Sequence, residues 1–196
     1  MTRLRRFGVA LLLVALLVPA TFVALAQWRE RAVAADAAPR TGRFVVAGDV
    51  RLFLQEAGPS DGPLVLFVHG TGAWSETWRA TLSALAGAGF HAVALDLPPF
   101  GYSERPTEPR YAKPEQAARI VGVLDALGAS SAVLVGHSFG GGPTVEAAMQ
   151  RPERVRALVL VDAALGIVAT GDAGNAPPAP PALVRAVLAV RPLRTS

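Results

Sequence analysis

The chain has 196 residues, of which 52% are hydrophobic and 17% charged, so it is long enough for one ordinary domain and is not an intrinsically disordered protein. Its formal net charge is +4, but three of those charges come from arginines within the first six residues, so we expect no nucleic-acid partner. The sequence contains no cysteine, which excludes disulfides, thiolate metal sites and a cysteine nucleophile.

The first 26 residues have the pattern of an export segment and predict an N-terminal apolar helix. Three arginines precede residues 7–26, a run of twenty residues without a charge. Ala24-Leu25-Ala26 has the form of a signal-peptide cleavage site, whereas about 20 apolar residues also suffice for an uncleaved membrane anchor. Either alternative exports the rest of the chain as a membrane-anchored, secreted or periplasmic protein. Residues 27–42 follow as a linker rich in alanine and charge.

Strand patterns begin at residue 43. Two short strand-like runs are joined at Gly48-Asp49, which is a hairpin signal. The apolar run 64–68 predicts a strand buried on both faces. A helix over about 75–86 and a strand over 90–95, which ends at Asp96, come next.

The second half of the chain continues the alternation of strands and helices. This order predicts an α/β fold, with a mostly parallel sheet and helices on both faces. In such a sheet, ligands gather at the carboxyl ends of the strands. The remaining predicted segments are a Pro/Gly-rich loop over 97–109, a helix over 114–127, a buried strand over 132–135, a helix over 143–150, and a buried strand over 155–161 that ends at Asp162.

Residues 136–140 contain the predicted catalytic motif. They read Gly136-His137-Ser138-Phe139-Gly140, a Gly-x-Ser-x-Gly motif between an apolar strand and a helix, which is the pattern of a nucleophile elbow. The turn is so tight that a side chain at either glycine would collide with its neighbours. It lifts the serine hydroxyl out of the sheet, and the amide at the start of the helix can stabilise an oxyanion there.

Three landmarks occur in a fixed order, namely the turn His69-Gly70, the loop of Asp96, Gly101 and Ser103, and the elbow at 136–140. In this order and strand context, residues 43–165 resemble the α/β-hydrolase superfamily. The most similar group contains serine esterases, carbon–carbon-bond hydrolases and perhydrolase-like enzymes. Serine at the elbow argues against the dehalogenase and epoxide-hydrolase branches, which use aspartate there.

The resemblance implies a role for each motif residue. Ser138 resembles the nucleophile, and the backbone amides of Phe139 and Thr71 resemble the two oxyanion donors, with Gly72 as a second candidate donor. Asp96 is expected to anchor the loop that contains Gly101 and Ser103. No cofactor motif or metal-ligand pattern occurs in the sequence, so we expect neither group. Structural roles at the site are expected for His69, Gly70, Gly136, His137 and Gly140.

The family places its triad in the order serine, acid, histidine, yet no histidine follows Ser138 in this sequence. His69 lies in the turn at residues 69–72 that carries the Thr71 donor, which we call the oxyanion turn. The family uses a histidine there to hold the loop. Neither His91 nor His137 is well placed as the base. Asp162 is a candidate for the triad acid, and a locally hydrogen-bonded loop carboxylate is the alternative.

We therefore expect residues 43–170 to be the N-terminal two thirds of a hydrolase domain, truncated before its last strands, and residues 171–196 to be the Pro-rich start of a cap segment. The expected function is hydrolysis of a small apolar ester or related carbonyl compound through an acyl-enzyme at Ser138, with this fragment inactive for want of a base. The alternative is a non-catalytic, membrane-tethered binding protein that keeps the fold. The sequence carries no signal for an oligomeric state.

Overall fold

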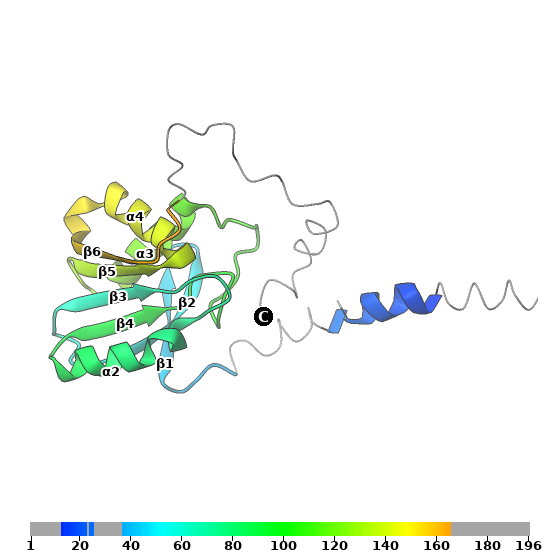
Figure 1. The fold of residues 1–196 in the computed structure, drawn as a ribbon, viewed down its shortest axis with the longest axis horizontal. Coiled ribbons are helices and arrows are strands. Elements are labelled where there is room, and N and C mark those ends of the chain that lie inside the picture. Colours follow the sequence, from blue (N-terminus) through cyan, green and yellow to red (C-terminus); the bar gives the residue numbers. More distant parts are fainter. Residues whose placement is uncertain (1–12, 23, 26–36, 166–196) are drawn as a thin grey trace, which may run out of the picture. The chain divides into compact units, whose positions relative to one another are not determined.

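The structure is a computed structural model that describes residues 13–22, 24–25 and 37–165 (Figure 1). Residues 13–22 and 24–25 are helical and belong to a different unit from the domain that begins at Ala38. Within the described residues, no helix is both long and apolar enough for a membrane span. The export segment and linker predicted over 1–42 lie partly outside the described residues, and the cap segment predicted over 171–196 lies wholly outside them.

A six-stranded sheet forms the centre of the domain. Its strands are β1 (Gly42–Ala47), β2 (Val50–Ala57), β3 (Leu64–Val68), β4 (His91–Leu95), β5 (Ala132–His137) and β6 (Val155–Val161). They lie in the order β1-β2-β4-β3-β5-β6 (Figure 1). β2 pairs antiparallel with β1 and with β4, whereas β4, β3, β5 and β6 run parallel. The predicted hairpin and the mostly parallel sheet are therefore confirmed.

Helices cover both faces of the sheet, as predicted. The α-helices are α2 (Arg79–Gly87), α3 (Lys113–Ala126) and α4 (Gly141–Gln150), and the short 3₁₀ helices are η1 (Ser75–Trp78), η2 (Ser138–Gly140) and η3 (Pro152–Arg154). α2 covers one face, and α3 and α4 cover the other (Figure 1). The apolar stripe of α3 is buried against the sheet through Ile120 and Leu124. On the other face, Leu82 of α2 packs in a cluster with Phe67 of β3.

The prediction that residues 155–161 form a buried strand is wrong in its burial. β6 spans these residues, but its last four side chains are 37–45% exposed. β6 is last in the strand order, so within the described residues it pairs with a neighbour, β5, on one side only. A continuous apolar run is typical of a central parallel strand, and here it lies at an edge.

Arg119 of α3 holds the β1–β2 hairpin against the helix layer. Its guanidinium is fully buried, and its Nε and Nη2 donate to the two carboxylate oxygens of Asp49 at 2.7 and 2.8 Å. Its Nη1 donates to the carbonyl of Arg110 and to the side chain of Gln116, both at 2.8 Å. Because these partners use its donors, the charge is tolerated in the interior. The hydrogen bond from Arg119 holds the pKa of Asp49 below its usual range.

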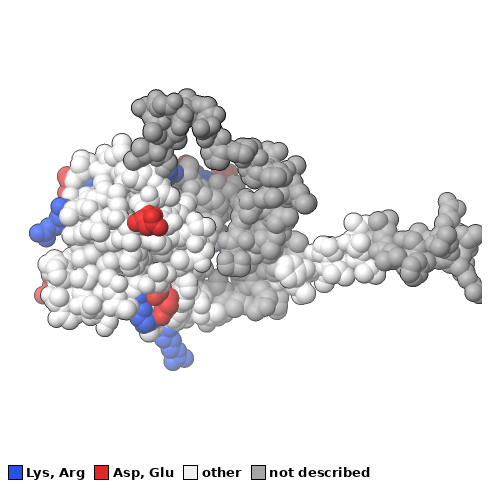
Figure 2. Space-filling view, viewed as in Figure 1, with Lys and Arg blue, Asp and Glu red and all other residues white. Residues whose placement is uncertain are grey.

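On the face seen in Figure 2, charged side chains lie in small, separate groups on a mostly uncharged surface. Exposed ion pairs such as Arg151–Glu153, with Nε and Oε1 2.7 Å apart, contribute little to stability.

Candidate active site

The nucleophile elbow is formed where β5 ends. Ser138 follows the last residue of β5 and has a φ of +49°, a left-handed conformation that a side chain rarely adopts. Such a conformation costs about 1–3 kcal/mol and is typical of functional turns. The amide of Ala164 donates to the Ser138 carbonyl at 2.9 Å, which ties the elbow to the segment after β6. Ser138 therefore stands, partly exposed, at the apex of a strand–turn–helix unit.

Close backbone contacts explain the two glycines of the motif. A Cβ at Gly136 would lie 2.8 Å from the Cα of Gly141, and one at Gly140 would lie 2.4 Å from the carbonyl oxygen of His69. The φ of Gly140 is −63°, which any residue adopts, so the restriction there is steric. Because the clash at Gly140 is with the turn after β3, glycine at position 140 lets that turn and the elbow pack together.

The turn after β3 faces the serine. A Cβ at Gly70 would lie 3.0 Å from the Cβ of Ser138. The amide of Ala73 donates to the Gly70 carbonyl at 3.3 Å and closes the turn, with Gly72 at a φ of +71°. Thr71, between them, is exposed.

Two backbone amides are free to act as oxyanion donors at this point. Among the backbone hydrogen bonds of the described loops and turns, none is donated by the amide of Thr71. Phe139 is the second residue of η2, so its amide belongs to a first turn, in which amides have no partner within the helix. The structure thus brings both predicted donors to the edge of the sheet that carries Ser138.

His69 holds the oxyanion turn against the next loop. Its ring is fully buried, its Nδ1 donates to the Gly70 carbonyl at 2.8 Å, and its Nε2 accepts from the Leu97 amide at 2.9 Å. Burial lowers the pKa of His69, so the ring stays neutral. Both ring nitrogens are used, and neither is free to take a proton from a serine.

The other two histidines are also not bonded to the serine. His91 begins β4, at the opposite end of the sheet, and its Nε2 lies 3.0 Å from a carboxylate oxygen of Glu56. The ring of His137 packs edge-on against Trp78, with the ring centres 6.3 Å apart. A Cβ at Gly70 would lie 3.0 Å from the Nδ1 of His137, so this ring points under the oxyanion turn. That Nδ1 is buried without a hydrogen-bond partner among the described residues.

Asp162 follows β6 at the same edge of the sheet as the elbow. It has a φ of +45° and is exposed, and the last residue of β6 pairs with His137. Among the described residues, no hydrogen bond joins its carboxylate to a histidine. Its role as triad acid stays a prediction.

Asp96 joins the loop that follows β3 to the loop that follows β4. Its buried carboxylate accepts from the amide of Ser75 through Oδ1 and from the amide of Tyr102 through Oδ2, each at 2.7 Å. The Ser103 hydroxyl donates to its carbonyl at 2.5 Å. Burial raises the pKa of Asp96, and the two amides oppose that effect. The sequence indicates the contact to the loop at 101–103, but not the one to Ser75.

Gln55 is a part of the site that the sequence does not reveal. It is 3% exposed, and its amide nitrogen donates to the Ser75 hydroxyl at 2.9 Å. The one signal available was a polar residue directly after the apolar run 52–54 of β2.

Comparisons with known proteins identify the fold family. The sequence model of a family described as alpha/beta hydrolase fold matches residues 63–190. A 2-hydroxymuconate semialdehyde hydrolase of Pseudomonas sp. (strain CF600) is 41% identical over 130 residues, which are 64% of this chain and 44% of that protein.

Solved structures also match this chain in fold. Epoxide hydrolase A from Mycobacterium thermoresistibile matches with a TM-score of 0.59 and 36% identity, over 61% of this chain and 38% of that one. A membrane phospholipase A, described as a bacterial virulence factor, matches with a TM-score of 0.60 and 32% identity, over 83% of this chain and 53% of that one. The matched parts span 38–53% of the length of these three relatives.

Proposed function

Because the chain belongs to the α/β-hydrolase fold family, we propose that it is a serine hydrolase that cleaves a carbonyl compound through an acyl-enzyme at Ser138. The observation that supports the proposal most strongly is the conformation of Ser138. This residue has a φ of +49° and lies opposite the oxyanion turn. The hydrolases among its relatives support the reaction class. Serine at the apex favours the branches that cleave esters and carbon–carbon bonds over the epoxide hydrolases.

In the proposed reaction, the Ser138 oxygen attacks the carbonyl carbon of an ester and its proton passes to a base. Negative charge then develops on the carbonyl oxygen, where the amides of Phe139 and Thr71 donate hydrogen bonds to it. Each such donor contributes about 10²–10³ in rate. The alcohol leaves with a proton, and water attacks the acyl-enzyme, which releases the acid and restores the serine.

None of the described histidines is hydrogen-bonded to Ser138, which supports the expectation that the base is not among them. Their hydrogen bonds go to Gly70, Leu97 and Glu56. A serine hydroxyl without a base is a weak nucleophile. We therefore expect the 196-residue chain to acylate slowly, at about 10³–10⁴-fold over the uncatalysed rate, and an added small base to accelerate it.

A fluorophosphonate probe with imidazole as the added base tests the proposal. We expect peptide mass spectrometry to find the phosphonyl group on Ser138, at a rate that rises with imidazole concentration. Ser138→Ala removes the adduct, whereas Ser83→Ala, an exposed serine in α2, leaves it unchanged. An adduct that persists in Ser138→Ala, or no adduct at any imidazole concentration, contradicts the proposal.

Aromatic rings beside the elbow favour a small apolar substrate. The ring of Phe139 lies 6.0 Å from that of Phe100, which in turn lies 5.8 Å from His69. These rings offer apolar contact next to the nucleophile. In the presence of imidazole, we expect short-chain p-nitrophenyl esters to acylate Ser138 faster than esters with a charged acyl group. Equal rates contradict this preference.

Export and attachment to a membrane through residues 7–26 are a further part of the proposal. Twenty uncharged residues behind an arginine cluster support it, as does the likeness to a membrane phospholipase A over 83% of this chain. We expect the full chain, expressed in bacteria, to resist alkaline extraction from membranes if uncleaved, or to reach the periplasm if cleaved. Retention in the cytoplasm contradicts both. A folded, membrane-bound chain whose Ser138 never reacts favours the non-catalytic binding protein instead.

A further inference from the structure

The loop that carries the Thr71 amide is short and is held at both ends. It begins at Gly70, next to His69, which is bonded to the Leu97 amide at 2.9 Å. It ends at Ser75, which is fully buried, whereas Thr71 and Gly72 between these ends are exposed. Because Thr71 and Gly72 are exposed, we expect the position of the Thr71 amide to depend on these two attachments.

Ser75 is attached to the sheet through two groups. Its amide donates to Asp96 at 2.7 Å, and its hydroxyl accepts from the Nε2 of Gln55 at 2.9 Å. Gln55 lies on β2, and its backbone is opposite Gly42 of β1 on one side and Ala94 of β4 on the other. It is therefore a point of the sheet whose backbone is fixed from both sides.

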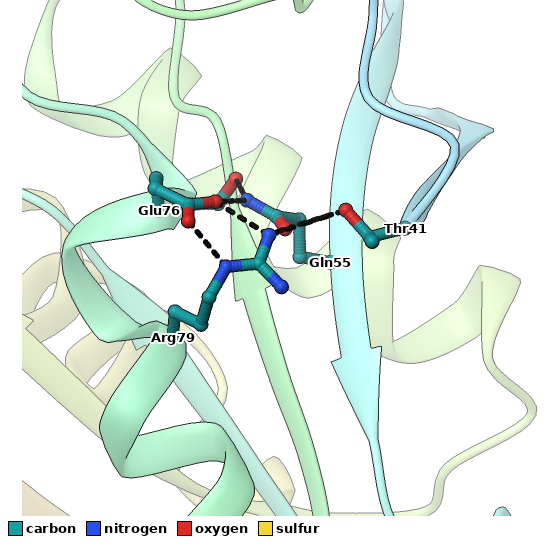
Figure 3. Close-up of polar contacts among 5 residues, drawn as sticks. Thr41, Gln55, Glu76 and Arg79 are labelled. Atoms are coloured by element: carbon teal, nitrogen blue, oxygen red, sulfur yellow. Dashed lines mark hydrogen bonds and ion pairs between the residues drawn. The ribbon is translucent and has the colours of Figure 1, made fainter.

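The side-chain amide of Gln55 has all four of its hydrogen-bonding positions occupied. Its Nε2 donates to Ser75 and also to Glu76 at 3.0 Å. Its Oε1 accepts from Arg79 at 2.6 Å and from the hydroxyl of Thr41 at 3.1 Å (Figure 3). Rotating the amide by half a turn would aim its NH₂ group at the guanidinium of Arg79. The cluster thus sets the orientation that lets Gln55 donate to Ser75.

We propose that Gln55 is a positioning residue for the oxyanion hole: through Ser75 it sets where the Thr71 amide lies relative to Ser138. The inference rests on the proposed function, because it needs the Thr71 amide to be a donor. A displacement of about 1 Å in such a group costs about 10²-fold in rate. Gln55→Met keeps the bulk of the side chain and removes its hydrogen bonds, while Glu76 and Arg79 can still pair with each other.

Labelling kinetics of Gln55→Met, Ser75→Ala and the double variant test the proposal in the full chain. With a fluorophosphonate and a fixed imidazole concentration, we expect the limiting rate constant at Ser138 to fall about 10–100-fold in each single variant. The concentration of probe that gives half the limiting rate stays within about twofold, because the binding surface is unchanged. The double variant is no slower than the slower single variant, since both substitutions break the same attachment.

The matched control is Arg43→Gln, which removes an exposed ion pair to Glu56 on the same two strands and does not touch the cluster. We expect it to label at the wild-type rate. A Gln55→Met variant that melts earlier but labels at the wild-type rate, or a double variant whose losses multiply, overturns the proposal.

Hydrogen exchange separates this inference from the proposed function. We expect the two hydrogen-bonded amides of this loop, those of Ala73 and Ser75, to exchange about tenfold faster or more in Gln55→Met than in the wild type, and at the wild-type rate in Arg43→Gln. If wild-type Ser138 does not react with the probe, the proposed function fails, and exchange alone then decides whether Gln55 holds the loop. Unchanged exchange of the Ala73 and Ser75 amides in Gln55→Met overturns the inference.

Discussion

Replacing Gly140 by alanine tests how closely the elbow and the oxyanion turn are packed. A Cβ at Gly140 would lie 2.4 Å from the carbonyl oxygen of His69, about 1 Å inside the 3.4 Å at which ordinary contact begins. The obstructing atom belongs to the backbone of the oxyanion turn, so the turn has to move. We expect Gly140→Ala to lower the free energy of unfolding by about 1–3 kcal/mol. Because the shift displaces the Thr71 amide, the rate of Ser138 labelling should fall by about 10²-fold.

Urea unfolding followed by tryptophan fluorescence measures the change in stability. With a urea dependence of about 2 kcal/mol per molar, the expected loss lowers the midpoint by about 0.5–1.5 M. Gly87→Ala is the matched control, because a Cβ there, at the end of α2, has no atom within 4 Å. We expect it to raise the free energy of unfolding by about 0.4–1 kcal/mol. A Gly140→Ala midpoint at or above that of the wild type would refute the packing argument.

Three further predictions concern strain and pH. Ser138→Gly should abolish labelling yet raise the free energy of unfolding by about 1 kcal/mol in urea titrations, because glycine adopts a φ of +49° without strain; a destabilised variant would show that this φ carries no strain. Asp49→Asn should lower the free energy of unfolding by about 1–3 kcal/mol near neutral pH, because Arg119 then stays buried without its counter-ion. Folding lowers the pKa of Asp49, so the greater stability of the wild type over Asp49→Asn is present above pH 3.8 and is lost as the pH falls through the folded-state pKa. A difference in unfolding free energy that does not change with pH would contradict this prediction. Burial lowers the pKa of His69, so the free energy of unfolding should decline as the pH falls below 6.5. Protonation of the ring breaks the hydrogen bond from the Leu97 amide. An unfolding free energy that stays constant below pH 6.5 would contradict this prediction.

Patterns of apolar residues and glycines were sufficient to predict the central strands and the elbow. The run 64–68 matches β3 residue for residue, because a parallel strand buried on both faces needs a continuous apolar run. The elbow was predicted from Gly136 and Gly140, because steric exclusion at a tight turn leaves a direct mark on the sequence.

Features that depend on neighbours in space were not predicted. The apolar run of β6 does not reveal that the strand is last in the sheet order, and hence exposed. Gln55 donates to Ser75, which lies 20 positions further along the chain, and nothing local to either residue indicates this pairing. The helix predicted over about 75–86 is divided into η1 and α2 at Trp78 and Arg79, which the helical period of the apolar residues does not show.

The proposed oxyanion hole consists of the two backbone amides of Phe139 and Thr71 beside Ser138. A crystal structure of the chain with a phosphonate bonded to Ser138 tests it most directly. We expect the phosphoryl oxygen to lie about 2.7–3.1 Å from the amide nitrogens of both Phe139 and Thr71. A phosphoryl oxygen that points to solvent, or that contacts neither amide, would contradict this oxyanion hole.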